Sequence, residues 1–101
     1  MSKVSMVGKI TCKDGEGDAM EAVFADMAAA CKDESGLEIY SYHRGDENTY
    51  WFFALMTDQE AMKGHGQNDA MKQAMAAFGS VMAAPPEMHV TTPVVANGFD
   101  C

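Results

Sequence analysis

The chain has 101 residues, 48% of them hydrophobic, and its 15 acidic residues against 7 basic ones give a formal net charge of −8. This length permits one domain with a single core, and the hydrophobic content predicts a fully folded chain. The negative charge repels phosphate backbones and anionic lipid surfaces, so we expect no nucleic acid partner and no membrane partner.

The first half of the chain predicts a strand, a helix and two further strands. Apolar and polar residues alternate from 4 to 12, as in a strand. Asp18 and Glu21 form a capping-box-like start for a helix that ends before Gly36. Two strands follow, at 36–43 and 48–56, joined by a hairpin loop. The apolar face of the helix recurs at helical spacing and comprises Met20, Val23, Phe24, Met27, Ala28 and Cys31.

A second helix is short. Thr57 and Glu60 form another capping-box pattern, and the helix they open continues to His65. Gly64 and Gly66 weaken it and are expected to end it.

The last part of the chain predicts a third helix and a fourth strand. Asn68 or Asp69 caps the helix, and the two prolines at 85–86 end it. The strand covers 88–95, and 96–101 is expected to be a tail. The face of the third helix comprises Met71, Met75, Phe78 and Met82.

Strand, helix, strand, strand, helix, strand is the ferredoxin-like order, with its second helix broken in two. We therefore expect one α+β domain over 1–101, with a core at 4–95, in which helices cover one face of a four-stranded antiparallel sheet.

The strand at 48–56 has no polar face from Tyr50 onward. A half-buried strand alternates apolar and polar residues, so here both faces need to be covered. Tyr50, Phe52 and Met56 are expected to face the helices. Trp51 and Phe53 are expected to face a second copy of the chain, which predicts a homodimer packed sheet against sheet.

The three cysteines at positions 12, 31 and 101 contain no C-x-x-C pair, and the first residues contain no apolar signal region. These features predict reduced thiols, no signal peptide and a cytoplasmic location.

Three motifs carry a resemblance to a known family. The run Gly36-x-x-x-Tyr40, the aromatic strand that ends at Met56, and Glu60-Ala61-x-x-x-His65 resemble the antibiotic biosynthesis monooxygenase family of dimeric α+β barrels. The resemblance covers about residues 4–95. It implies the barrel-forming dimer and an activity from a set that includes cofactor-free oxygenases of quinols and anthrones, haem-degrading enzymes and isomerases.

The chain departs from the family at three positions. Ala54 and Met56 stand where the family usually has a glutamate and a tryptophan, and Gly8 stands where the haem-degrading branch needs an asparagine. These departures disfavour haem degradation. There is no dinucleotide fingerprint and no zinc-like spacing of His and Cys, so we expect neither a cofactor nor a metal.

His65 and Tyr40 are the candidate catalytic residues. His65 shares a helix face with Ala61 and Met62, so its imidazole could take a proton from a phenolic substrate. The alternative is a helix-end histidine that binds a backbone carbonyl. Tyr40 could hold a substrate oxygen by a hydrogen bond, whereas Tyr42 fits an interface rim equally well.

Four residues are candidate walls of a substrate pocket, namely Trp51, Phe52, Met56 and Met62. The aromatic rings could stack on a planar substrate, but a dimer core explains Trp51 without a ligand. The ten methionines could form a deformable apolar pocket or an ordinary core. His43 and His89 are expected at the surface.

These observations predict a cofactor-independent monooxygenase that acts on a quinol, an anthrone or a similar planar phenolic compound. A non-catalytic dimeric barrel that binds a small molecule, and an isomerase on the same scaffold, remain as alternatives.

Overall fold

The computed structural model describes residues 2–101. Its elements in chain order are β1 (Val4–Thr11), α1 (Gly17–Cys31), β2 (Leu37–Arg44), β3 (Thr49–Met56), α2 (Gln59–Gly66), α3 (Asp69–Met75), the 3-10 turn η1 (Phe78–Ser80) and β4 (Glu87–Thr91).

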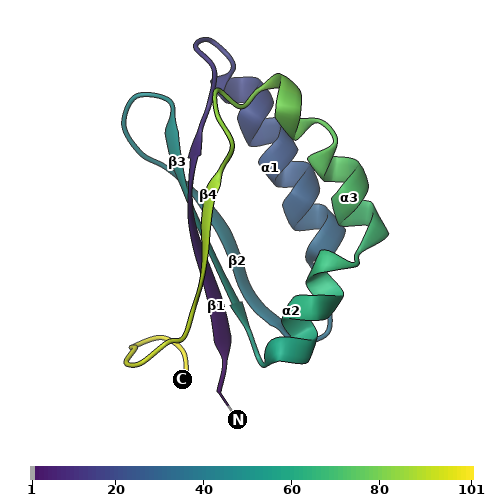
Figure 1. Ribbon diagram of the computed structural model, residues 1–101, viewed down its shortest axis with the longest axis vertical. Coiled ribbons are helices and arrows are strands. Elements are labelled where there is room, and N and C mark those ends of the chain that lie inside the picture. Colours follow the sequence, from purple (N-terminus) through teal and green to yellow (C-terminus); the bar gives the residue numbers. More distant parts are fainter. Residues whose placement is uncertain (1) are drawn as a thin grey trace.

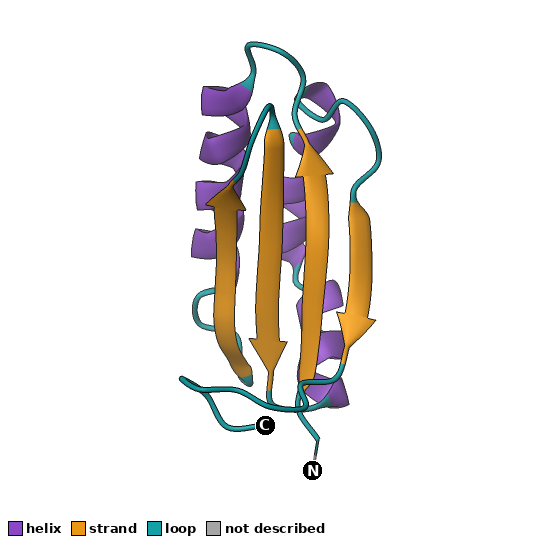
Figure 2. Ribbon diagram, turned by 90° about the vertical axis from the view of Figure 1, so that its left-hand side faces the viewer, coloured by secondary structure: helices purple, strands orange, loops and turns teal. Residues whose placement is uncertain are grey.

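The four strands form one antiparallel sheet in the order β2-β3-β1-β4. The helices cover one face of this sheet (Figure 1), and within residues 2–101 no helix lies on the other face, called the open face below (Figure 2). This arrangement is the α+β ferredoxin-like fold that the element order predicts. None of the helices within the described residues has the length and apolar composition of a membrane span.

The side chains of β3 alternate between the two faces of the sheet as the sequence predicts. Tyr50, Phe52 and Met56 are buried against the helices. Trp51 points to the open face and is 51% exposed. Successive side chains of a strand alternate between its two faces, which separates these residues.

The start of α1 differs from the predicted capping box. The helix begins at Gly17, and its N-cap residue Glu16 makes no side-chain capping bond. Glu21 instead accepts hydrogen bonds from Arg44 and from the Tyr50 hydroxyl, which fasten α1 to the hairpin of β2 and β3.

The caps of the two later helices are side-chain caps. Asp58, rather than Thr57, caps α2 by accepting from the Ala61 amide at 2.9 Å. Asn68 caps α3 by accepting from the Met71 amide at 3.2 Å. An oxygen at this position satisfies a backbone N–H that has no partner within the helix.

The third helix is shorter than predicted, since α3 ends at Met75. The chain beyond it hydrogen-bonds to the end of β1: the Ala83 amide donates to the Thr11 carbonyl, and the Lys13 amide donates to the Val81 carbonyl, both at 2.8 Å. The two bonds form an antiparallel bridge between Cys12 and Met82, so the Ala83 amide already has a partner in β1 and a helix does not continue to the prolines.

The fourth strand is also shorter than predicted and ends at Thr91. Pro93 follows, and a proline has no N–H with which to extend the ladder. The tail packs on the sheet, because the centroid of the Phe99 ring lies 6.1 Å from that of the Phe53 ring. The tail crosses one end of the open face (Figure 2). Leu55, on that same face, is fully buried.

Candidate functional site

A cavity of about 490 Å³ lies between the sheet and the helices. Aromatic and thioether side chains form most of its wall, and Phe52 on β3 is part of its floor. Methionine side chains adapt to ligands of different shape, because the thioether is unbranched and polarizable. Six methionines line it, namely Met6, Met27, Met71, Met75, Met82 and Met88.

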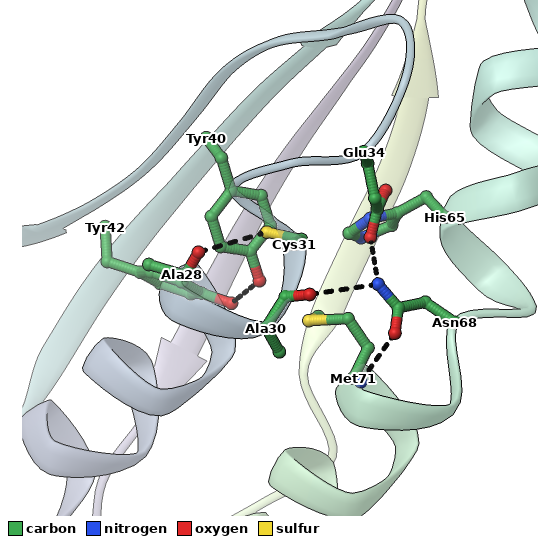
Figure 3. A network of polar contacts seen from close by, with 9 residues as sticks. All are labelled: Ala28, Ala30, Cys31, Glu34, Tyr40, Tyr42, His65, Asn68 and Met71. Atoms are coloured by element: carbon green, nitrogen blue, oxygen red, sulfur yellow. Dashed lines mark hydrogen bonds and ion pairs between the residues drawn. The ribbon is translucent and has the colours of Figure 1, made fainter.

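His65 and Glu34 form a hydrogen-bonded pair at one end of this cavity (Figure 3). The His65 Nδ1 atom lies 2.8 Å from Glu34 Oε1, and both side chains are 14% exposed. The contact joins α2 to the turn that follows α1. When Nδ1–H donates to the carboxylate, Nε2 is left with the lone pair and can act as a base.

Asn68 holds the second oxygen of that carboxylate. Its Nδ2 donates to Glu34 Oε2 at 2.6 Å and to the Ala30 carbonyl at 3.1 Å. Since the same side chain caps α3 through its oxygen, Asn68 links the end of α1 to the start of α3. The carboxylate is thereby fixed in position beside His65.

A pair of tyrosine hydroxyls faces the cavity from β2. The oxygens of Tyr40 and Tyr42 lie 2.7 Å apart, and the Tyr42 hydroxyl donates to Met27 Sδ at 3.8 Å. The consistent direction of donation is therefore from Tyr40 to Tyr42 to the thioether. Burial raises the pKa of both hydroxyls above the ordinary value, so both stay protonated and serve as donors rather than bases.

Packing holds the two rings in place. Phe24 stacks on the Tyr42 ring with a centroid separation of 3.9 Å and an interplanar angle of 7°. The Tyr40 ring lies 5.6 Å from the His65 ring. The base and the hydroxyl donors therefore lie on adjoining walls of one cavity.

The structure brings three of the six predicted site residues together: His65, Tyr40 and Phe52 all line the cavity. Trp51 lies on the opposite face of the sheet and cannot contact a ligand there. Met56 is fully buried in the core, and Met62 is half-buried against that core; neither is part of the cavity wall. The strand parity that separates Trp51 from Phe52 is the physical reason.

Three polar residues of the site were not among the predicted ones. Glu34 ends the charged run Lys32-Asp33-Glu34, which has the composition of a solvated helix end. The sequence predicts Asn68 only as a helix cap, and it assigns Tyr42 equally to a pocket wall and to an interface rim. No sequence signal joins Glu34 to His65, because 31 residues separate them.

Met88 occupies the space beside Gly8, where the haem-degrading branch of the family has an asparagine. A side chain added at Gly8 would meet Met88 Sδ and the Glu87 carbonyl. Met88 thus fills the space that a side chain at position 8 would need, and it supplies an apolar part of the cavity wall.

Cys31 lies beside the His65 and Glu34 pair. Its thiol is fully buried and donates to the Ala28 carbonyl at 3.7 Å. Burial, followed by the charge of Glu34, raises the pKa of this thiol to about 11. The thiol is therefore protonated at neutral pH and is a poor nucleophile. The two other candidate histidines, His43 and His89, are exposed, as expected.

Several solved structures are similar to this chain. One of them is a protein from Caulobacter crescentus CB15 that is described as an antibiotic biosynthesis monooxygenase. The two sequences are 30% identical, the match covers 93% of this chain and 92% of that chain, and the TM-score is 0.87. A protein from Chloroflexus aurantiacus J-10-fl with the same description is 24% identical. The match covers 98% of this chain and 100% of that chain, with a TM-score of 0.82.

A third similar structure is SnoaB from Streptomyces nogalater, described as a cofactor-independent oxygenase. It is 20% identical, with 98% of this chain and 100% of that chain covered and a TM-score of 0.83, which supports the fold. A search of curated protein sequences found no match. The family model described as "Antibiotic biosynthesis monooxygenase" matches residues 3–77, so the chain belongs to the antibiotic biosynthesis monooxygenase family.

Proposed function

We propose that this protein is a cofactor-independent oxygenase of planar phenolic compounds, such as quinols or anthrones. The observation that carries the proposal is the His65 and Glu34 pair at the end of an otherwise largely apolar cavity. Family membership supports an oxygenase, and the resemblance to SnoaB supports one that needs no cofactor. We further propose that the protein acts as a homodimer in the cytoplasm, where its cysteines stay reduced.

The cavity suits a flat aromatic ligand. Its volume of about 490 Å³ lies within the range of roughly 300–1,000 Å³ typical of small-molecule sites. Ring surfaces would pack against Phe52 and the methionines, and burying them would supply most of the binding free energy. Such a wall orients a ring weakly, so the polar groups must define which edge of the ligand faces His65.

The proposed reaction begins with a proton transfer. His65 Nε2 removes a proton from the acidic CH₂ of an anthrone or from the hydroxyl of a quinol. The resulting carbanion passes electrons to dioxygen, and a C–O bond forms to give a peroxide, which takes its proton from the His65 imidazolium. Loss of the proton that remains on the oxygenated carbon breaks the O–O bond. One oxygen atom becomes a carbonyl, and the other leaves as water with the two hydrogens.

Glu34 and the tyrosines have separate parts in this reaction. Glu34 holds the imidazole in the tautomer that leaves Nε2 free and stabilises the imidazolium that forms. The Tyr42 proton is directed at a thioether, a weak acceptor, so a substrate oxygen can take its place. A neutral donor there stabilises the negative charge that develops on a phenolate or enolate oxygen.

The same base and donor could move a proton along an enol without oxygen, which would make the protein an isomerase. Oxygen consumption distinguishes the two reactions. A non-catalytic binding barrel would bind the compounds and neither consume oxygen nor convert them.

The test is an oxygen-electrode screen of anthrones and hydroquinones, with product analysis after reaction under ¹⁸O₂. We expect one labelled oxygen atom in the product. His65→Ala should lower turnover by about two to four orders of magnitude, whereas the control His43→Ala should change it little, because His43 pairs with Trp51 on the face of the sheet opposite the cavity. Equal activity in the two variants, at matched folding, would contradict the role of His65. Binding without oxygen uptake would favour the isomerase or the non-catalytic barrel.

A further inference from the structure

Three potential metal ligands converge at one end of the cavity (Figure 3). They are the Cys31 thiol at the end of α1, the Glu34 carboxylate in the turn that follows, and the His65 imidazole on α2. Their ligand atoms all lie within 4.8 Å of one another. Neither the family nor the sequence spacing points to this cluster, because it exists only once α2 has packed against the end of α1.

The donor set of one sulfur, one nitrogen and one oxygen is typical of zinc. Zn²⁺ binds thiolate at about 2.3 Å, and imidazole and carboxylate at about 2.0–2.2 Å, in a tetrahedron. Those bond lengths place the ligand atoms about 3.3–3.7 Å apart. Rotations about side-chain bonds therefore suffice to bring the three groups from their positions in the structure to a metal ion, with no change of fold.

The surroundings of the cluster are also those of a metal site. Asn68 donates to Glu34 Oε2 at 2.6 Å and fixes the carboxylate, while Oε1 faces His65. Hydrogen bonds of this kind to a ligand typically raise metal affinity. The cluster is mostly enclosed, since Cys31 is fully buried and the two other side chains are 14% exposed.

A route for a cation reaches the cluster from outside. A second cavity, of about 450 Å³, shares Glu34 and His65 with the site, and Asp58 and Glu60 also line it. Acidic side chains along such an entrance raise the local concentration of cations. The net charge of −8 acts in the same direction.

We propose that Cys31, Glu34 and His65 form a binding site for one thiophilic divalent cation, of which Zn²⁺ is the best match. Binding breaks the Cys31 S–H bond, releases the proton to solvent and forms a metal–thiolate bond, with no change of oxidation state. Water would complete the tetrahedron. A cation held there occupies a nitrogen of His65 and thus opposes its use as a base; this consequence, unlike the binding, rests on the proposed function.

The test uses Co²⁺ as a spectroscopic probe, on the full chain without an affinity tag. All proteins carry Cys101→Ser, because the exposed thiol at the end of the chain could bind the probe itself. We expect one Co²⁺ per chain with the intense visible bands of tetrahedral cobalt, a thiolate charge-transfer band in the ultraviolet, and displacement of the cobalt by Zn²⁺. The readout is independent of turnover, so its failure and the failure of the proposed function are separate results.

Two substitutions assign the ligands. Cys31→Ser should abolish the charge-transfer band, and Glu34→Gln should weaken Zn²⁺ binding at least tenfold. The matched control is Cys12→Ser, which removes the other buried cysteine and should leave the spectrum unchanged. Circular dichroism verifies that each variant is folded. If Cys31→Ser unfolds, the loss of Zn²⁺ affinity in Glu34→Gln still tests the site. Only weak octahedral bands, or a charge-transfer band that survives in Cys31→Ser, would overturn the proposal.

Discussion

The Tyr40 and Tyr42 hydroxyls lie 2.7 Å apart on one face of β2, and the second of them donates onward to the sulfur of Met27. They form a short chain of donors that ends at a weak acceptor. The group with a proton to offer a ligand is therefore Tyr42, and Tyr40 polarises it.

This order of donation predicts unequal effects of two conservative substitutions. Tyr42→Phe should lower kcat/KM for a responsive quinol on the order of 10²-fold, because it removes a donor to the developing oxyanion. Tyr40→Phe should cost less, since Tyr42 keeps its own proton. Steady-state oxygen uptake measures both variants. A larger loss in Tyr40→Phe would reverse the assigned roles and return Tyr40 to the position predicted from sequence.

The open face of the sheet predicts assembly. Val7 and Trp51 are exposed there at 38% and 51%, and Phe53 lies beside them under partial cover from Phe99. We expect a two-fold symmetric dimer through this face, which light scattering at micromolar concentration should detect. Trp51→Glu should dissociate or unfold it, because a charge buried in the interface would lack a partner.

The matched control for the dimer is Ala29→Glu, which places the same charge on an exposed position of α1, on the helical side of the molecule. It should leave the mass unchanged. A monomer in the unsubstituted protein would remove the prediction altogether.

Gly36 is predicted to tolerate no side chain. Its φ of +84° is strained for other residues, and an added Cβ would lie 2.6 Å from Ala61 Cβ and 2.8 Å from Thr57 Oγ1. Gly36→Ala should therefore cost about 2–5 kcal/mol in the free energy of unfolding, from backbone strain and crowding together. Gly15 has a similar φ of +78°, and no atom of the described residues lies within 4 Å of an added Cβ, so Gly15→Ala should cost only about 1 kcal/mol. Urea denaturation of both variants measures the difference, and equal losses would show that crowding at Gly36 has no effect.

The contacts of Glu21 predict a dependence of stability on pH. Hydrogen bonds from Arg44 and then from Tyr50 lower the pKa of this carboxyl from 4.5 to about 2. A group whose pKa falls on folding stabilises the folded state above its unfolded pKa and loses that effect as the pH falls through its folded pKa. The contribution should therefore be complete above about pH 5 and lost towards pH 2.

The measurement is the urea midpoint of the protein and of Glu21→Gln between pH 2 and pH 7. The two midpoints should differ at pH 7 and converge at pH 2. Asp26→Asn, at an exposed position of the same helix, is the control and should give a smaller difference at pH 7. A difference for Glu21→Gln that stays constant with pH would contradict the prediction.

Some of the site follows from local patterns. Alternation in the strands assigns Phe52 to the helical face and Trp51 to the open face, because the side-chain period of a strand is two residues. The periodicity of α1 likewise predicts its buried face. Local patterns set the element order and the fold, and they identify His65 and Tyr40 as candidates.

Other features depend on contacts between distant segments. The third helix ends early because the chain beyond it pairs with the end of β1, and the tail lies against Phe53 through the ring of Phe99. The spacing of apolar residues within either segment does not predict these contacts.

The sequence by itself therefore determined the α+β fold, the faces of its strands and helices, and the presence of one histidine near a cavity. Only the tertiary structure decided that Glu34, Cys31 and Asn68 would surround that histidine. These residues come from the end of α1, the turn after it and the cap of α3, and they meet His65 because two helices pack across one sheet. Their chemistry depends on distances of a few ångströms between segments that are remote in the chain, and those distances are fixed only by packing.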